Sequence, residues 1–174
     1  MFHELLTDLI AAATSSVFSI MLGQEVEVGP SVLETAGTGP SNGVAAVVGI
    51  AGAYSGTGGV VCSTDVACSL AGMMMLSEYS AIDDEVLDSM GEIANMIVGN
   101  VKTEMESRFG PMGLSTPTVI YGRNFATRSA GTHTWTVVPF TFAGKHFVVQ
   151  MMLTASSPGG RGPVLPTMVT VCQR

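Results

Sequence analysis

The chain has 174 residues and a formal net charge of −7, with 47% of its residues hydrophobic and only 12% charged. This length suits one domain with a substantial core. The acidic balance disfavours nucleic acid and anionic membranes as partners, because both would repel such a surface. No run of about 18 residues is free of polar groups, so membrane insertion is not expected.

The apolar stretch that ends at Gly23 resembles an export signal only in part. Glu4 and Asp8 precede it, and it has no basic segment in front. Such a start argues against export, so we expect a cytoplasmic protein. The three cysteines, Cys62, Cys68 and Cys172, form no CxxC pair and have no ligand spacing to a histidine. We therefore expect reduced, structural thiols and no metal on this chain.

The first half of the chain predicts one long helix, two paired strands and a short helix. Helical periodicity covers residues 4–22, and Gly23 is placed to end that helix. Residues 25–33 read as a short extended segment and residues 35–43 as a loop. Residues 44–64 predict a strand, a Gly/Ser turn and a return strand, and residues 65–76 a short helix.

A second long helix is predicted from about Ile82 to about Arg108, with Ser80 and Asp83 as its capping box. Apolar residues recur at spacings of three or four on one side: Ile82, Val86, Met90, Ile93, Ile97, Val101 and Met105. On another side of the same helix, polar or small residues recur at the same spacing: Glu85, Asp88, Glu92, Asn95, Gly99, Lys102 and Glu106. This pattern is typical of an amphipathic helix with one buried face.

The remainder predicts mainly strands. Residues 118–122 form a strand, residues 123–131 a connection, and residues 132–153 a long hairpin that turns at 143–145. The tail opens as a flexible segment, and residues 168–172 either add a last strand or stay loose. We therefore predict an α+β fold with two long helices packed on one face of a mainly antiparallel sheet. A single domain would cover residues 1–155, and residues 156–174 would form a C-terminal extension.

Asp88, Glu92 and Asn95 are the main candidates for a functional site. They fall at i, i+4 and i+7, so their side chains share one side of the second long helix. From periodicity alone a solvated face is the stronger interpretation, although Asn is unusual in a helix interior. Gly91 lies beside them and costs about 1 kcal/mol relative to Ala. It either leaves a bare patch for an approaching surface or a notch where two helices cross.

These residues resemble the motif of the CheC/CheX family of chemotaxis phosphatases. The motif reads as Asp88, three residues, Glu92, two residues and Asn95, followed by Pro117 after twenty-one residues rather than about twenty-two. The segment SSVFSIMLGQEVEVG at residues 15–29 is similar to the end of the first helix and the entry strand of that family. No second ExxN occurs on the first helix, which favours the CheX-like branch, whose members form homodimers.

The resemblance implies a phosphatase that hydrolyses the aspartyl phosphate of a CheY-like response regulator. Asn95 would then position the attacking water, Glu92 would bind the regulator's lysine, and Asp88 would support the pair. Mg²⁺ is expected on the regulator and no cofactor on this chain. The alternative is a non-catalytic chemotaxis or flagellar-switch adaptor that binds the same kind of regulator.

Overall fold

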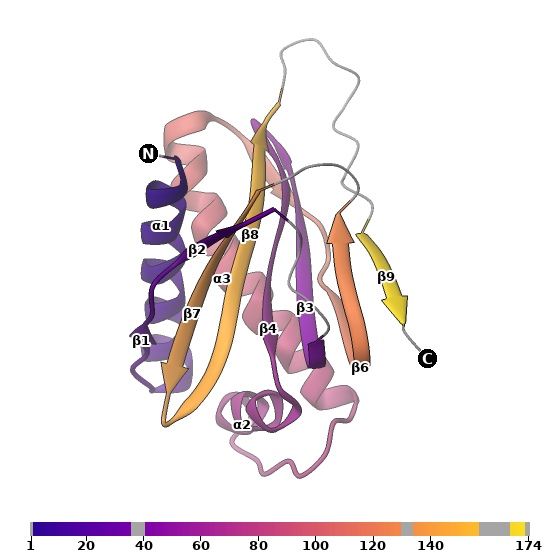
Figure 1. Cartoon of the computed structure of the whole chain (residues 1–174). Helices are drawn as coiled ribbons and strands as arrows, with labels where there is room; N and C mark the ends of the chain where they lie inside the picture. The colour runs from indigo at the N-terminus through magenta and orange to yellow at the C-terminus, as the bar shows by residue number, and fades with distance from the viewer. Residues whose placement is uncertain (1, 36–40, 130–133, 157–167, 173–174) are drawn as a thin grey trace.

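One antiparallel sheet forms the frame of the molecule (Figure 1). The computed structural model describes residues 2–35, 41–129, 134–156 and 168–172, without the side chains of 41–42, 124–129 and 168–172. Seven strands follow the order β1-β7-β8-β4-β3-β6-β9, while β2 also pairs with β7 and β5 with β3. The strands are β1 Glu27–Val28, β2 Val32–Glu34, β3 Ser41–Gly52, β4 Tyr54–Cys62, β5 Met112–Leu114, β6 Thr118–Ser129, β7 Trp135–Phe142, β8 Lys145–Ala155 and β9 Met168–Cys172.

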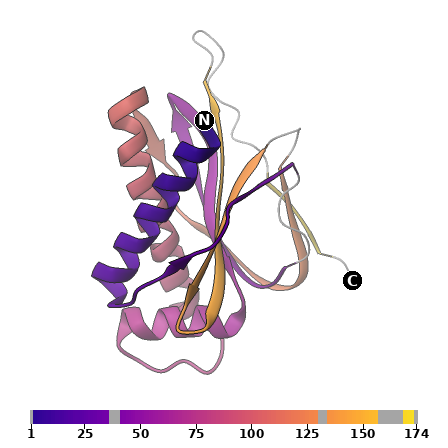
Figure 2. The same cartoon turned by 60° about the vertical axis from the view of Figure 1, so that its left-hand side comes forward.

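Two long helices, α1 (Phe2–Val17) and α3 (Asp84–Phe109), lie side by side against one face of this sheet (Figure 2). A π-helical turn, η1 (Phe18–Leu22), extends α1, and the short helix α2 (Thr64–Met75) lies near the start of α3. The predicted α+β arrangement is therefore confirmed. Its physical basis is that each long helix carries one apolar side that only the sheet and the neighbouring helix can cover.

Phe2–Leu22 is long and apolar enough, by composition alone, to cross a membrane. In this fold, however, the buried residues of α1 lie in the same core cluster as those of α3 and the sheet. A core helix of a globular domain meets the same compositional test.

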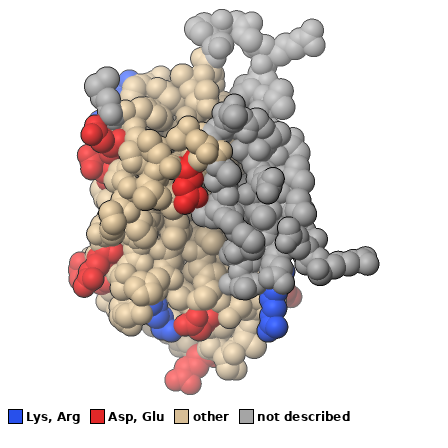
Figure 3. All heavy atoms as spheres, viewed as in Figure 1, with Lys and Arg blue, Asp and Glu red and all other residues tan. Residues whose placement is uncertain are grey.

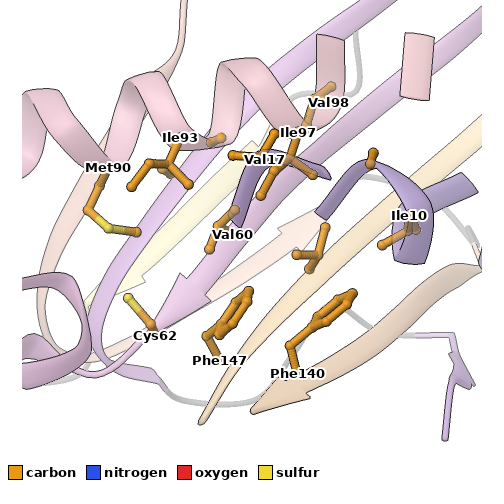
Figure 4. Packing of buried hydrophobic residues seen from close by; sticks show 14 of the residues in the cluster. Ile10, Val17, Val60, Cys62, Met90, Ile93, Ile97, Val98, Phe140 and Phe147 are labelled. Atoms are coloured by element: carbon orange, nitrogen blue, oxygen red, sulfur yellow. The ribbon is translucent and has the colours of Figure 1, made fainter. Parts of the chain in front are cut away.

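The core lies between the two long helices and the sheet (Figure 4). Met90, Ile93 and Ile97 point from α3 toward the strands, where Val60 and Phe147 meet them. The apolar stripe predicted for this helix is buried from Val86 to Met105, which confirms the helical periodicity. Strand β3 contributes every second residue to the same cluster, as the period of a strand requires.

The start of α3 differs from the sequence prediction. The helix begins at Asp84, and the N-cap is Asp83, whose carboxylate accepts a hydrogen bond of 2.9 Å from the backbone N–H of Val86. Ser80 is therefore not the cap, and Ile82 precedes the helix although it still packs against the core. A carboxylate is the stronger choice here, because it also interacts favourably with the positive end of the helix.

Strand β6 runs further than predicted. Residues 123–129, expected to form part of a connection, continue the strand, and residues 125–129 pair with β9. The pairing partners lie 39 to 47 residues further along the chain, from Ser129–Met168 to Phe125–Cys172, beyond the reach of local pattern. The β7–β8 hairpin does turn at Ala143 and Gly144, which have φ values of 46° and 74°. Two consecutive positive values suit the tight turns that join twisted strands.

A polar ridge on helix α3

Asp88, Glu92 and Asn95 form a ridge along the solvent side of α3, called here the α3 ridge. Asp88 and Glu92 are exposed, whereas Asn95 is half-buried. Residues three or four apart on a helix have Cβ atoms about 5–6 Å apart, so each side chain neighbours the next. The structure therefore brings together the three residues that the sequence singled out.

The helix that carries the ridge is held at both ends. Asp83 caps its first turn, as described above. In its last turns Lys102 forms an ion pair of 2.7 Å with Glu106, whose other carboxylate oxygen accepts a 2.8 Å hydrogen bond from Met112 N–H at the start of β5. Lys102 and then this N–H hold the pKa of the Glu106 carboxyl below its usual value. The ridge thus lies on a fixed scaffold rather than on a loop.

Gly91 packs against β6, and this corrects both sequence interpretations of it. A Cβ atom added at Gly91 would lie 3.3 Å from Val119 Cγ2 and 3.5 Å from Pro117 Cγ. Gly91 is buried, so it leaves no bare patch, and its neighbours come from β6 and the residue before it rather than from a second helix. Pro117, the last residue of the motif, therefore lies directly against α3.

The position of Gly91 also tells which side of α3 faces β6. Gly91 is three residues from Asp88 and four from Asn95, so all three lie along one side of the helix. Asn95 is therefore the ridge residue that leans toward Pro117 and β6. This placement agrees with its half-buried side chain.

The ridge side chains are free to contact another molecule. Within the described residues, none of Asp88, Glu92 and Asn95 has a side-chain hydrogen bond or ion pair with another residue. A carboxylate can accept hydrogen bonds from an ammonium group, and a carboxamide can both donate to and accept from one water molecule. Across the described part of the chain, no three His, Cys, Asp or Glu residues cluster closely enough to hold a metal ion.

An open cavity of about 1060 Å³ lies near the start of α3. It is lined by parts of α2, the segment before α3 and β6, among them Tyr79, Ile82, Tyr121 and Arg123. Charged side chains are sparse on the described surface in Figure 3 but gather at the end near α2. There Lys145 forms an ion pair of 3.0 Å with Asp65. Local sequence patterns could not predict this cavity, because the residues that line it come from segments distant in the chain.

Comparison with known proteins shows the family. Residues 44–141, which include the whole α3 ridge and Pro117, match the family described as "Chemotaxis phosphatase CheX". The chain belongs to the CheX family. The resemblance found in the sequence is thereby confirmed, while the individual roles of Asp88, Glu92 and Asn95 stay predictions.

Individual relatives agree with this assignment. The CheY-P phosphatase CheX of Thermotoga maritima is 30% identical over 86 residues, which cover 49% of this chain and 56% of that protein. The match thus spans little more than half of that curated relative. The fold is similar to that of the chemotaxis protein CheX from Desulfovibrio desulfuricans, with a TM-score of 0.77, 24% identity, and coverage of 86% of this chain and 99% of the other.

A third relative comes from a complex. In the CheX–CheY–BeF₃–Mg²⁺ complex of Borrelia burgdorferi, the matching chain has a TM-score of 0.72 and 27% identity. The match covers 84% of the present chain and 96% of that one. Several CheX-type proteins therefore share this arrangement of helices and sheet over nearly their whole length.

Proposed function

We propose that this protein is a CheX-like phosphatase that hydrolyses the aspartyl phosphate of a CheY-like response regulator. The observation that carries the proposal is the pair Glu92 and Asn95, which has no partner in the described part of the chain and lies on a helix fixed at both ends. The family match over residues 44–141 supports the proposal. The names of the Thermotoga relative and of the Borrelia complex point to the same substrate.

In the proposed reaction one water molecule attacks phosphorus in line with the bond to the aspartate oxygen. The P–O bond breaks, the aspartate carboxylate leaves with the bonding electrons, and the water becomes part of inorganic phosphate. Little covalent chemistry is required of the protein, so positioning the water supplies much of the acceleration. The carboxamide of Asn95 suits this task, because it orients a water without exchanging a proton at neutral pH.

Glu92 would contribute by docking. Its carboxylate, one helical turn from Asn95, would pair with the active-site lysine of the regulator and so fix the position of Asn95 relative to the phosphoryl group. Mg²⁺ would belong to the regulator, where it neutralises charge on the phosphoryl oxygens. Asp88 would support the pair, since its exposed carboxylate lies one turn before Glu92 on the same side.

The test is the decay of a phosphorylated cognate CheY in the presence of Mg²⁺, with and without this protein. Asn95→Ala should lower kcat about a hundredfold or more while the regulator still binds, because the amide acts mainly in the transition state. Glu92→Ala should weaken both binding and kcat, and Asp88→Ala should have a smaller effect than either.

Asn100→Ala is the matched control. Asn100 is an exposed residue of the same type on the same helix, and the five-residue offset turns it away from the ridge. Its variant should retain wild-type activity. Wild-type rates in both Asn95→Ala and Glu92→Ala would contradict the site. Binding without any acceleration across the cognate regulators would favour the adaptor function instead.

The proposal includes a cytoplasmic homodimer. Phosphorylated response regulators are cytoplasmic, and the strongly apolar composition fits a subunit interface in addition to the core. Light scattering on the purified full chain gives the mass directly. A mass near twice the 18.0 kDa of one chain is expected, and a monomer at micromolar concentration would contradict the dimer.

A further inference from the structure

Tyr121 is an exposed aromatic side chain beside the α3 ridge. Its side chain is 54% exposed, and no other described residue hydrogen-bonds its hydroxyl. It lies two residues after Val119, which contacts Gly91. Because side chains alternate along a strand, Tyr121 and Val119 lie on the same face of β6.

The pairing of β6 with β3 shows where Tyr121 lies along α3. Val119 pairs with Ala46 and Tyr121 with Val44, and Val44 also pairs with Cys62, just before α2 begins. Since Gly91 marks the level of Val119, β6 proceeds from the ridge toward the start of α3. Tyr121 therefore lies beyond Val119 in the direction of the start of α3, toward the end of the ridge that carries Asp88.

Tyr121 and Arg123 also line the open cavity described above, together with Tyr79 and Ile82. Arg123 is exposed and has no ion pair within the described residues. These four residues are called here the Tyr121 surface. It combines two tyrosines, an apolar side chain and the guanidinium of Arg123, which has no ion pair with a described residue, around a hollow.

We propose that the Tyr121 surface binds the part of the response regulator that surrounds its phosphorylated aspartate. This inference rests on the proposed function and adds residues that determine affinity for the substrate. A specific protein interface buries about 800 Å² on each partner, which three ridge side chains cannot supply. The interface must therefore extend to exposed groups next to the ridge.

The composition of the Tyr121 surface favours this direction of extension. Tyrosine and arginine are enriched among the residues that contribute most to protein interfaces, particularly beside hollows that exclude water. Arg123 would face the negative charge around a phosphorylated aspartate. Toward the other end of α3, the ridge side of the helix offers less, because Lys102 already pairs with Glu106 and Gly99 has no side chain.

The inference predicts a change in KM rather than in kcat. With phosphorylated CheY as substrate, Tyr121→Ala should raise KM about tenfold and leave kcat within about twofold, because Tyr121 contacts the regulator equally before and during the reaction. Tyr121→Phe should restore most of the affinity. Phe109→Ala is the matched aromatic control, since Phe109 is also exposed but lies about 30 Å from Asp88 along the same helix.

Arg123→Glu gives an independent test that does not depend on removing an aromatic ring. Reversal of an exposed charge should raise KM at low ionic strength, and the difference should shrink as salt screens the interaction. If Tyr121→Ala fails to fold by circular dichroism, Arg123→Glu decides alone. Folding of Arg123→Glu is expected because its side chain is exposed.

The outcomes separate this inference from the proposed function. An active wild-type enzyme with unchanged KM in both Tyr121→Ala and Arg123→Glu would overturn the Tyr121 surface and leave the phosphatase intact. A loss of kcat in Tyr121→Ala at unchanged KM would also overturn it, because docking would not be its role. A wild type that accelerates no cognate regulator would overturn the proposed function, and this inference with it.

Discussion

The ring of Pro117 lies against the backbone of Gly91, although 25 residues separate them in the chain. A Cβ atom at Gly91 would approach Pro117 Cγ to 3.5 Å and Val119 Cγ2 to 3.3 Å. This contact sets the spacing between α3 and β6 in the middle of the ridge. Gly91 and Pro117, the last residue of the motif, thus form one packing contact, and we expect this contact to position the ridge without taking part in the reaction.

Replacement of Gly91 by Ala should change stability little and activity more. Alanine favours the helix by about 1 kcal/mol, but its Cβ would press on the stiff, branched side chain of Val119. The two effects should leave the free energy of unfolding within about 1 kcal/mol of the wild type. Because either Val119 or α3 must give way by a few tenths of an ångström, kcat on phosphorylated CheY should fall several-fold.

Urea denaturation together with phosphatase kinetics checks this prediction. The control is Gly99→Ala, because a Cβ at Gly99 would meet only Leu114 Cδ1, at an ordinary 3.7 Å. That variant should gain stability and keep its activity. Equal kinetics in the two variants would show that the contact between Gly91 and β6 does not position the ridge.

The sequence predicted the ridge because it lies on one helix. Spacing of three and four residues places Asp88, Glu92 and Asn95 together whatever the rest of the fold does. The environment of Gly91 could not be predicted in the same way, because its neighbours come from a segment that returns after a complete helix and a strand. The position of Tyr121 near the start of α3 could not be predicted for the same reason: within its own strand it is an ordinary aromatic residue.

Asp83→Ala should destabilise the protein by about 1 kcal/mol, because the N–H of Val86 loses its capping carboxylate. Ser80→Ala should have no measurable effect, since α3 begins four residues later. Chemical denaturation of the two variants beside the wild type measures both free energies. A larger loss in Ser80→Ala than in Asp83→Ala would restore Ser80 as the cap.

This capping difference shows how local patterns mislead. Ser80 and Asp83 fit the spacing of a capping box, and Asp83 alone fits a simple N-cap equally well. The first helical residue decides whether Ser80 or Asp83 is the N-cap. The sequence placed this residue too early, because Ile82 is apolar and in phase with the helix. It packs against the core from outside the helix. The full length of β6 could not be predicted from local patterns either, because its second part pairs with the distant strand β9.

The Glu106 contacts should make stability fall in acid. The folded state lowers the pKa of this carboxyl from its ordinary 4.5 through Lys102 and Met112 N–H. The contribution is therefore present above pH 4.5 and is lost as pH falls through the lower, folded-state pKa. Glu106→Gln should consequently be less stable than the wild type at pH 7, and the difference should shrink as pH falls through the lower, folded-state pKa.

Denaturant titrations at several pH values test this dependence. Glu104→Gln is the matched control, because Glu104 is exposed on the same helix and forms no ion pair with any described residue. Its stability should follow that of the wild type at every pH. A difference between wild type and Glu106→Gln that does not shrink as pH falls below 4.5 would contradict an electrostatic role.

Cys62 should be unreactive in the folded protein. Burial, and to a smaller extent Asp65 and Cys68, raise the pKa of its thiol from 9.0 to about 12. The thiolate is the nucleophile, so an aromatic disulfide reagent at pH 8 should not label this residue until the chain unfolds. Because the folded-state pKa is raised, this group contributes stability below pH 9 that is lost as pH rises toward 12.

Comparison of the wild type with Cys62→Ala isolates this thiol from the other two cysteines. At pH 8 the two native proteins should release equal amounts of aromatic thiolate from the reagent. In denaturant the wild type should release one equivalent more, from Cys62. Between pH 9 and 12 the wild type should lose more stability than Cys62→Ala. An extra equivalent from the native wild type would mean that Cys62 is accessible, and that β4 opens where it joins α2.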